Sequence, residues 1–173
     1  WVCSITNTSI PEALKNVEEY YSDTNDLLNS SFFLPYLSGE RTPHNDPYIR
    51  GSFHSMKTTT NSTSLQYAVI EGISFGIPDG VNSILKVNNN FEKIFMVGGG
   101  SKSKFWIELL ASLLNRKLSV CDQSEFGAAL GVARLSMYAD KNFDNKENII
   151  KEIKISDSFN PKRDKIDILL KRY

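Results

Sequence analysis

The longest run of helical periodicity in the chain covers about residues 63–86. Apolar residues recur there at i, i+4 spacing, which predicts one core-facing stripe on an amphipathic helix. The stripe consists of Leu65, Val69, Ile73 and Ile77. Pro78 falls within the same segment. Because proline has no backbone N–H and crowds the preceding turn, we expect a kink or break at about residues 74–79.

Further helices and strands alternate on either side of this segment. The helical patterns lie at 9–20, 103–115, 124–139 and 161–172, and the strand patterns at 32–37, 51–56, 93–97 and 117–121. The run at 93–97 is almost continuously apolar, as in a strand covered on both faces, whereas 117–121 alternates as in a half-buried strand. The polar stretches 22–31 and 38–51 and the asparagines around 88–90 are predicted as loops. The order of helices and strands predicts an α/β layered domain.

Composition removes several classes of function. Of 173 residues, 40% are hydrophobic and 23% charged, and 20 basic residues balance 20 acidic ones, which gives no electrostatic case for binding nucleic acid or an anionic membrane. No apolar run approaches the roughly 20 residues that a membrane-spanning helix needs. Cys3 and Cys121 are too few and too far apart for a zinc site or a disulfide framework, and they favour a reducing, cytoplasmic setting. The chain starts at Trp1 without a basic leader, so we expect that it begins inside a longer protein.

A glycine-rich turn follows the apolar strand pattern at 93–97. Its sequence is GGGSKS, from Gly98 to Ser103, and it leads directly into a predicted helix. Glycines allow a flat ligand to approach the backbone, and a helix N-terminus favours an anion. The spacing matches neither GxGxxG nor GxxxxGK[ST], so neither a dinucleotide fold nor a P-loop is indicated. A tight turn with Ser101 or Ser103 as helix cap explains the same residues.

The loop SGERTPHNDPYIRG (38–51) is unusually rich in polar side chains. Arg41 and Arg50 carry forked donors that suit phosphate, and His44 and Asp46 could form a general-base pair, although no nucleophile accompanies them. The same residues could equally hold the loop together through Asx turns and salt bridges. Both interpretations stay open on the residues alone.

The remaining candidates favour structural roles. The small residues of GAALGVA in 124–139 allow a helix to pack closely on a neighbour, while His54 and Trp106 fit a strand and a core stripe better than chemistry. No metal-ligand cluster, Ser-His-Asp arrangement or acid/base carboxylate pair is evident. Taken alone, the residues indicate an α/β domain with a candidate nucleotide turn.

Several blocks in their order resemble the FGGY family of carbohydrate kinases over nearly the whole chain. The motif GERTPH is more similar to the xylulose kinases of that family than to its gluconate or glycerol kinases. The similar blocks are FLPYLSGERTPHNDPYIRG (33–51), SLQYAVIEGISF (64–75), MVGGGSKSKFWIELLASLLNRKL (96–118), EFGAALGVARLSMYA (125–139) and FNPKRDKIDILLKRY (159–173). The sequence departs from the family pattern at Ser55, usually glycine, at Ser64, usually charged or amide, and at Pro78.

The resemblance implies an RNase H-like fold of the actin and hexokinase type, with two lobes around a cleft. Such kinases transfer the γ-phosphoryl group of ATP, with Mg²⁺, to a sugar hydroxyl, here that of D-xylulose. The chain would be the later part of the carboxy-terminal lobe. The catalytic aspartate, most sugar contacts and the Mg²⁺ site would lie in an amino-terminal lobe, so no catalytic or metal-binding residue is expected here. A homodimer is one possible assembly.

The resemblance also assigns residues. Gly98, Gly99, Gly100 and Ser101 would line the adenosine pocket, and Lys104 would face the adenine. Glu40, Arg41 and Arg50 would lie near the cleft. The resemblance thus favours a nucleoside-facing turn over a simple capped turn, and ATP would be bound through its nucleoside rather than its phosphates at this point.

Overall fold

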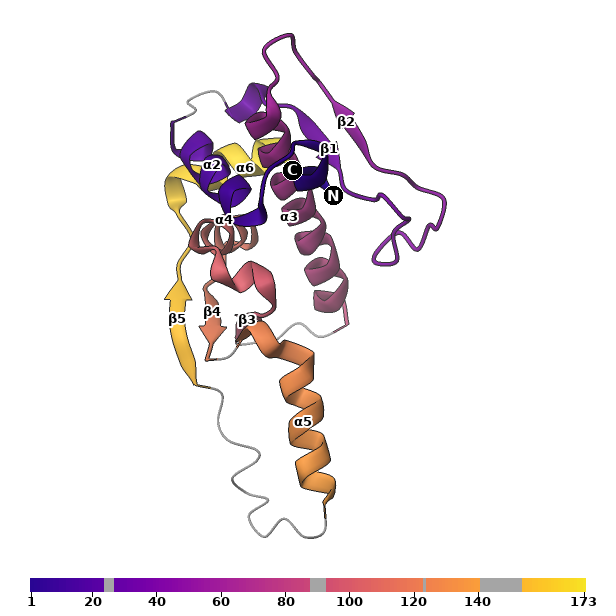
Figure 1. Ribbon diagram of the computed structural model, residues 1–173, viewed down its shortest axis with the longest axis vertical. Helices are drawn as coiled ribbons and strands as arrows, with labels where there is room; N and C mark the ends of the chain where they lie inside the picture. Colours follow the sequence, from indigo (N-terminus) through magenta and orange to yellow (C-terminus); the bar gives the residue numbers. More distant parts are fainter. Residues whose placement is uncertain (24–26, 88–92, 123, 141–153) are drawn as a thin grey trace.

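A computed structural model describes residues 1–23, 27–87, 93–122, 124–140 and 154–173 (Figure 1). The predicted loop at 88–90 lies outside the described residues. The helices and short 3-10 turns are α1 (Val2–Ile5), α2 (Ile10–Asp23), η1 (Leu27–Asn29), α3 (Ser62–Leu85), η2 (Gly99–Lys102), α4 (Lys104–Leu114), η3 (Ser124–Phe126), α5 (Gly127–Ala139) and α6 (Arg163–Arg172). The strands are β1 (Phe32–Leu34), β2 (Ser52–His54), β3 (Ile94–Met96), β4 (Leu118–Cys121) and β5 (Ile155–Phe159).

The strands form two small sheets. In one, β3 runs parallel to β4, and β4 pairs antiparallel with β5, a strand that the sequence pattern did not predict. In the other, β1 and β2 form an antiparallel pair that carries the 38–51 loop between them. The strand predicted at 117–121 is present as β4, but it is not half-buried, because it lies between two neighbouring strands and its Leu118, Ser119 and Val120 are all buried. The three residues of β3 are only partly buried, so this strand is not covered on both faces within the described chain.

Helix α4 joins the two halves of the core. One face packs on the sheet, where Ile107 and Leu110 meet Leu118 and Phe159. Its other face joins a cluster drawn from four helices and η1. That cluster consists of Val17, Tyr21, Leu27, Tyr67, Ile70, Phe105, Leu109, Leu113 and Leu169. Burial of these apolar surfaces, worth about 25 cal/mol per Å², fixes α2, α3 and α6 around α4.

Helix α3 has the predicted extent but buries a different face. Ile73 and Ile77 of the expected stripe are 39% and 43% exposed, whereas Tyr67, Ser74 and Pro78 are buried. The core-facing side is set by contact with α2, α4 and β1, not by the most apolar line of residues. Of the kink or break expected at about residues 74–79, the break does not occur, since α3 is one continuous helix through Pro78.

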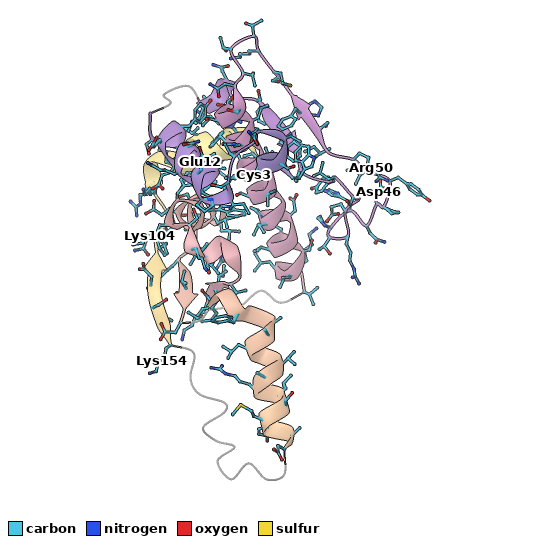
Figure 2. All side chains as sticks on the ribbon, in the orientation of Figure 1. Cys3, Glu12, Asp46, Arg50, Lys104 and Lys154 are labelled. Carbon is cyan, nitrogen blue, oxygen red and sulfur yellow. The ribbon has the colours of Figure 1, made fainter. Side chains whose placement is uncertain are left out.

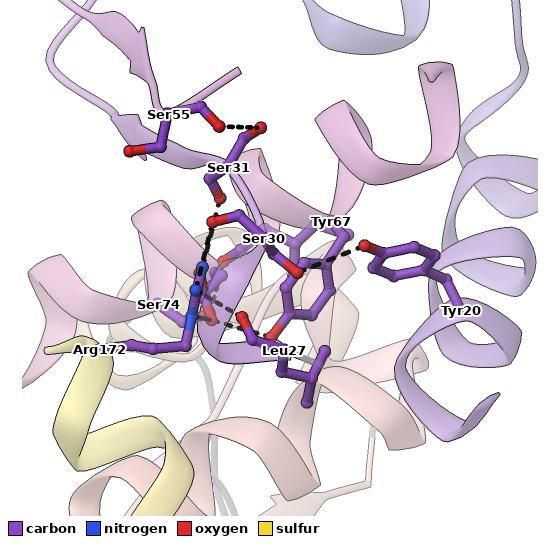
Figure 3. A network of polar contacts seen from close by, with 10 residues as sticks. Tyr20, Leu27, Ser30, Ser31, Ser55, Tyr67, Ser74 and Arg172 are labelled. Carbon is purple, nitrogen blue, oxygen red and sulfur yellow. Dashed lines mark hydrogen bonds and ion pairs between the residues drawn. The ribbon is translucent and has the colours of Figure 1, made fainter. Parts of the chain in front are cut away.

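Segment 27–31, predicted as a surface loop, instead has three buried residues, Leu27, Ser30 and Ser31. Arg172 of α6 is buried there and donates from Nε and Nη2 to the two carboxylate oxygens of Glu71, at 2.7 and 2.6 Å (Figure 3). Further donations go to main-chain carbonyl oxygens of Leu27 (2.5 Å), Ser30 (3.3 Å) and Ser31 (3.2 Å). We call Arg172 and Glu71 the buried ion pair. It ties the carboxy-terminal helix to α3 and to the chain entering β1.

Tyr67 makes stability sensitive to alkaline pH. Its side chain is fully buried and its hydroxyl donates to Glu71 Oε1 at 2.8 Å. Burial, and then the adjacent carboxylate, raise the pKa of Tyr67 far above its ordinary value of about 10. The unfolded chain therefore loses this proton first. The contribution of Tyr67 to stability is constant below pH 10 and falls above it, by up to about 1.4 kcal/mol per pH unit.

Urea unfolding between pH 8 and 11.5 tests this expectation on the unaltered chain and on Tyr67→Phe. The phenylalanine variant should lose less stability per pH unit above pH 10. Tyr173, whose hydrogen bond to Asp79 raises its pKa to about 12, adds a smaller slope to both because it is half exposed. Identical slopes in the two proteins would contradict the assignment.

Candidate functional site

The glycine turn is built by hydrogen bonds to η3. Gly98 has φ of +84°, a conformation that side chains disfavour, and its N–H donates to the Ser124 carbonyl oxygen at 2.8 Å. The Ser101 hydroxyl donates to the Gly98 carbonyl oxygen at 2.7 Å and lies 2.8 Å from the Ser124 hydroxyl. Ser124 thus holds the turn from both ends. This role of Ser124 was not predicted from the sequence. Only the position of Ser124 directly before the 125–139 block could have suggested it.

The turn then enters α4 through a side-chain cap. Ser103 is the N-cap, and its hydroxyl accepts from the backbone N–H of Trp106 at 3.3 Å. The capped-turn interpretation is therefore confirmed for Ser103. Ser101 has another task, because its hydroxyl is engaged with Gly98 and Ser124.

A groove of about 530 Å³ runs between this turn and α2. The α2 wall comprises Ile10, Pro11, Leu14, Lys15 and Glu18, and the opposite wall Gly99, Lys102, Ser103 and Lys104. Its volume lies in the range of small-molecule sites, and it combines an apolar floor with lysines around it. Such a surface suits a flat, partly apolar ring with an anionic substituent. The contribution of α2 was not anticipated from the sequence.

The five predicted nucleotide residues divide into two groups. Gly99 and Lys104 line the groove, and both are exposed. Gly98, Gly100 and Ser101 shape the turn and are not among the lining residues. A Cβ on Gly99 would meet no atom within 4 Å, whereas one on Gly100 would lie 3.3 Å from the Trp106 ring. Gly99 is therefore the glycine whose missing side chain leaves room for a ligand.

The 38–51 loop is a second, separate feature. Figure 2 shows Asp46 and Arg50 on an arm that projects away from the body on the side opposite Lys104. The structure therefore does not bring this loop to the glycine turn within the chain.

Three polar side chains of the loop, those of Glu40, Asp46 and Arg50, hold it together. The Glu40 carboxylate accepts backbone N–H groups of Thr42 and, at 2.8 Å, His44, and Asp46 Oδ1 accepts those of Tyr48 (2.7 Å) and Ile49 (3.3 Å). Arg50 turns back on the loop and donates to the carbonyl oxygens of residues 47 and 49. The self-supporting interpretation holds for the Asx turns, and no salt bridge within the loop is present among the described residues.

Arg41 differs from Glu40, Asp46 and Arg50, because its side chain makes no hydrogen bond within the loop. Its guanidinium is exposed and has no partner among the described residues. Of the three residues expected near a cleft, Arg41 is the one whose side chain makes no hydrogen bond to the loop. His44 does not face a nucleophile. Its ring packs edge-to-face on Tyr36, with centroids 5.7 Å apart.

The described residues contain no group of three His, Cys, Asp or Glu side chains that could hold a metal ion. None of the helices in the described part has the length and apolar character needed to cross a bilayer.

Comparison with known proteins defines the class first. Residues 1–139 match the carboxy-terminal domain of the FGGY family of carbohydrate kinases. The chain therefore belongs to this family, and the predicted RNase H-like α/β lobe is confirmed by its solved members.

Within the family, the chain is similar to xylulose kinases. It is 34% identical over 146 residues to that of Staphylococcus epidermidis and 32% identical over 139 residues to that of Escherichia coli, which covers 84% and 80% of this chain. A crystal structure of a xyloylose kinase from Brucella ovis superposes with a TM-score of 0.78 at 31% identity, over 99% of this chain and 34% of that one. The chain spans only 29% and 28% of the first two relatives.

Proposed function

We propose that this chain is the carboxy-terminal, nucleotide-holding part of a sugar kinase that converts ATP and D-xylulose to ADP and D-xylulose 5-phosphate. The observation that carries the proposal is the groove beside Gly99, where the backbone is open and α2 supplies an apolar wall. The similarity to xylulose kinases over more than four-fifths of the chain supports the choice of sugar. An adenine ring would lie against Gly99, with Lys104 at its edge.

The chemistry divides between this chain and an amino-terminal lobe. The oxygen of the sugar 5-hydroxyl forms a bond to the γ-phosphorus, the bond from that phosphorus to the bridging oxygen of ADP breaks, and the hydroxyl proton passes to a base. We assign the base, the sugar contacts and the Mg²⁺ ligands to the other lobe. Here the protein contributes by position and charge rather than by covalent chemistry.

The exposed surface of helix α5 is consistent with a chain that is part of a longer kinase. It has no buried residue, and its Val132 and Leu135 are 63% and 71% exposed (Figure 1). The small residues of GAALGVA thus have no neighbour to pack on within the described chain, contrary to the sequence expectation. Strand β3 pairs on one side only among the described strands. In a kinase three times as long, both surfaces would be covered by the remaining polypeptide.

The three departures from the family pattern do not favour the alternative that this chain is a non-catalytic, nucleotide-binding remnant of a kinase. Ser55 adopts φ of +58°, the left-handed conformation that explains glycine at this position in the family. Ser64 completes a reciprocal capping box with Asn61, with 2.9 Å bonds in both directions. Pro78 lies in an uninterrupted helix. The fold accommodates all three residues. The main alternative to a D-xylulose kinase is therefore a kinase of the same family that acts on another sugar or polyol.

A Gly99→Val substitution in the complete kinase tests the nucleotide assignment. The added side chain would enter the groove, so KM for ATP should rise about 10- to 100-fold, equivalent to about 1.4–2.8 kcal/mol of lost binding. The KM for D-xylulose should stay within twofold of that of the unaltered protein. The Tm should change by no more than about 2 °C, because the new Cβ would meet no atom within 4 Å. Gly80→Val, at another open position on α3, is the matched control.

Equal losses of ATP and sugar affinity would contradict the division of labour. Phosphorylation assays with D-xylulose, D-gluconate and glycerol decide the sugar. The 173-residue chain alone should show no turnover. We further place the protein in the cytoplasm, since both cysteines are free thiols. ATP or ADP and the sugar are its expected partners, with a homodimer as one possible assembly.

A further inference from the structure

The Trp106 side chain lies under the glycine turn. It comes from the first turn of α4, and helical side chains lean toward the helix N-terminus, which directs the ring back to the turn. A Cβ on Gly100 would be 3.3 Å from Trp106 Cζ3 and 3.4 Å from Cε3. The ring therefore occupies the space into which a Gly100 side chain would extend, one residue from Gly99, although it does not line the groove.

The opposite edge of the same ring is anchored to α3. Trp106 Nε1 donates to the Ser74 hydroxyl oxygen at 2.8 Å, and that hydroxyl donates to the Ile70 carbonyl oxygen at 2.7 Å. Ser74 is fully buried and belongs to the stretch of α3 that also bears Glu71 of the buried ion pair (Figure 3). The indole also packs against both clusters of the core. Its position is thus determined from several sides.

We infer that Trp106 is a positioning residue for the nucleotide turn, and that its hydrogen bond to Ser74 sets where Gly99 lies at the edge of the groove. The inference rests on the proposed nucleotide function. The turn contains three consecutive glycines, whose backbone is intrinsically soft. Ser124 restrains it from one side and the Trp106 ring from the other. Loss of the anchor lets the ring and the turn shift together, which lowers affinity without removing any group that contacts the ligand.

The test uses the 173-residue chain with Trp1→Phe, which leaves Trp106 as its one tryptophan. ADP is titrated into this protein and into the same protein with Ser74→Ala, and Trp106 emission is recorded. Ser112→Ala is the matched control. Ser112 is an equally buried serine that donates to the residue four positions earlier and accepts from the Lys162 backbone N–H, but it does not contact the ring.

Both serine variants should lower Tm by about 4–8 °C, because each removes a hydroxyl that makes two hydrogen bonds. Only Ser74→Ala should shift the Trp106 emission maximum and raise the Kd for ADP, by about three- to tenfold. If ADP binds the parent protein but the two serine variants have the same Kd, Trp106 is merely structural and the inference is wrong. If the parent protein shows no saturable ADP binding, the same variants are compared in the complete kinase, and a lack of saturable ADP binding there would overturn both the proposed nucleotide function and the inference.

Discussion

Replacing Arg172 with alanine should destabilise the protein by about 3–5 kcal/mol, the usual cost of removing one partner from a buried ion pair. The Arg172 and Glu71 side chains are each 1% exposed, so the remaining Glu71 carboxylate would be left without its cation in the interior. Three carbonyl oxygens at residues 27, 30 and 31 would also lose their donor. The guanidinium stacks over Phe32, with Cζ 4.1 Å from the ring centroid, and this contact would be lost too.

Urea unfolding measures the effect, with Lys171→Ala as the control because Lys171 is its exposed neighbour. The double variant Glu71→Leu/Arg172→Met removes both charges while keeping apolar volume. It should be much closer to the unaltered protein than either single change. A loss below about 1 kcal/mol for Arg172→Ala would show that solvent reaches the pair, and the structural assignment would then be wrong.

The second large effect is expected for Gly72→Ala on α3. A Cβ at this position would lie 2.1 Å from the main-chain oxygen of Phe33 in β1, closer than any real contact. Helix and strand must therefore separate, and such overpacking costs about 2–3 kcal/mol. The same substitution at Gly76, one turn further along α3, meets no atom within 4 Å. Gly76→Ala should be neutral or stabilise the protein by up to about 1 kcal/mol, because alanine favours helix.

Thermal or urea unfolding of the two alanine variants gives a direct comparison within one helix. A difference of less than 1 kcal/mol between them would refute the close approach of α3 and β1. This approach also affects the position of the 38–51 loop, because β1 leads into it. A Gly72→Ala kinase that folds should therefore also show an altered arm, which protease cleavage at the loop would reveal.

Local sequence patterns were sufficient for the elements whose determinants are local. The periodicity of α3 and α4, the cap at Ser103 and the apolar runs of β1 and β3 each depend on residues a few positions apart, and their approximate locations are confirmed. The ordered blocks around GERTPH and the glycine turn were likewise enough to indicate the family. Asx turns within the 38–51 loop were one of two interpretations of its polar residues. They are confirmed at Asp46, whose carboxylate accepts the backbone N–H groups of Tyr48 and Ile49.

Other features depended on contacts between distant segments. The sequence could not show that Ile73 faces outward while Ser74 is buried, since this depends on where α4 and β1 pack against α3. Nor could it pair Arg172 with Glu71, 101 positions earlier, because a lone arginine in a polar tail is usually a solvated one.

The glycine turn separates the two kinds of information most clearly. The sequence alone determined that a strand ends in three glycines and that a capped helix follows, while the resemblance to the family predicted that this turn faces adenosine. Only the tertiary structure decided that Gly98 bends, Gly99 opens on a groove and Gly100 rests on Trp106. The physical reason is that a glycine has no side chain to reveal its role. That role is defined by what the rest of the fold places beside it.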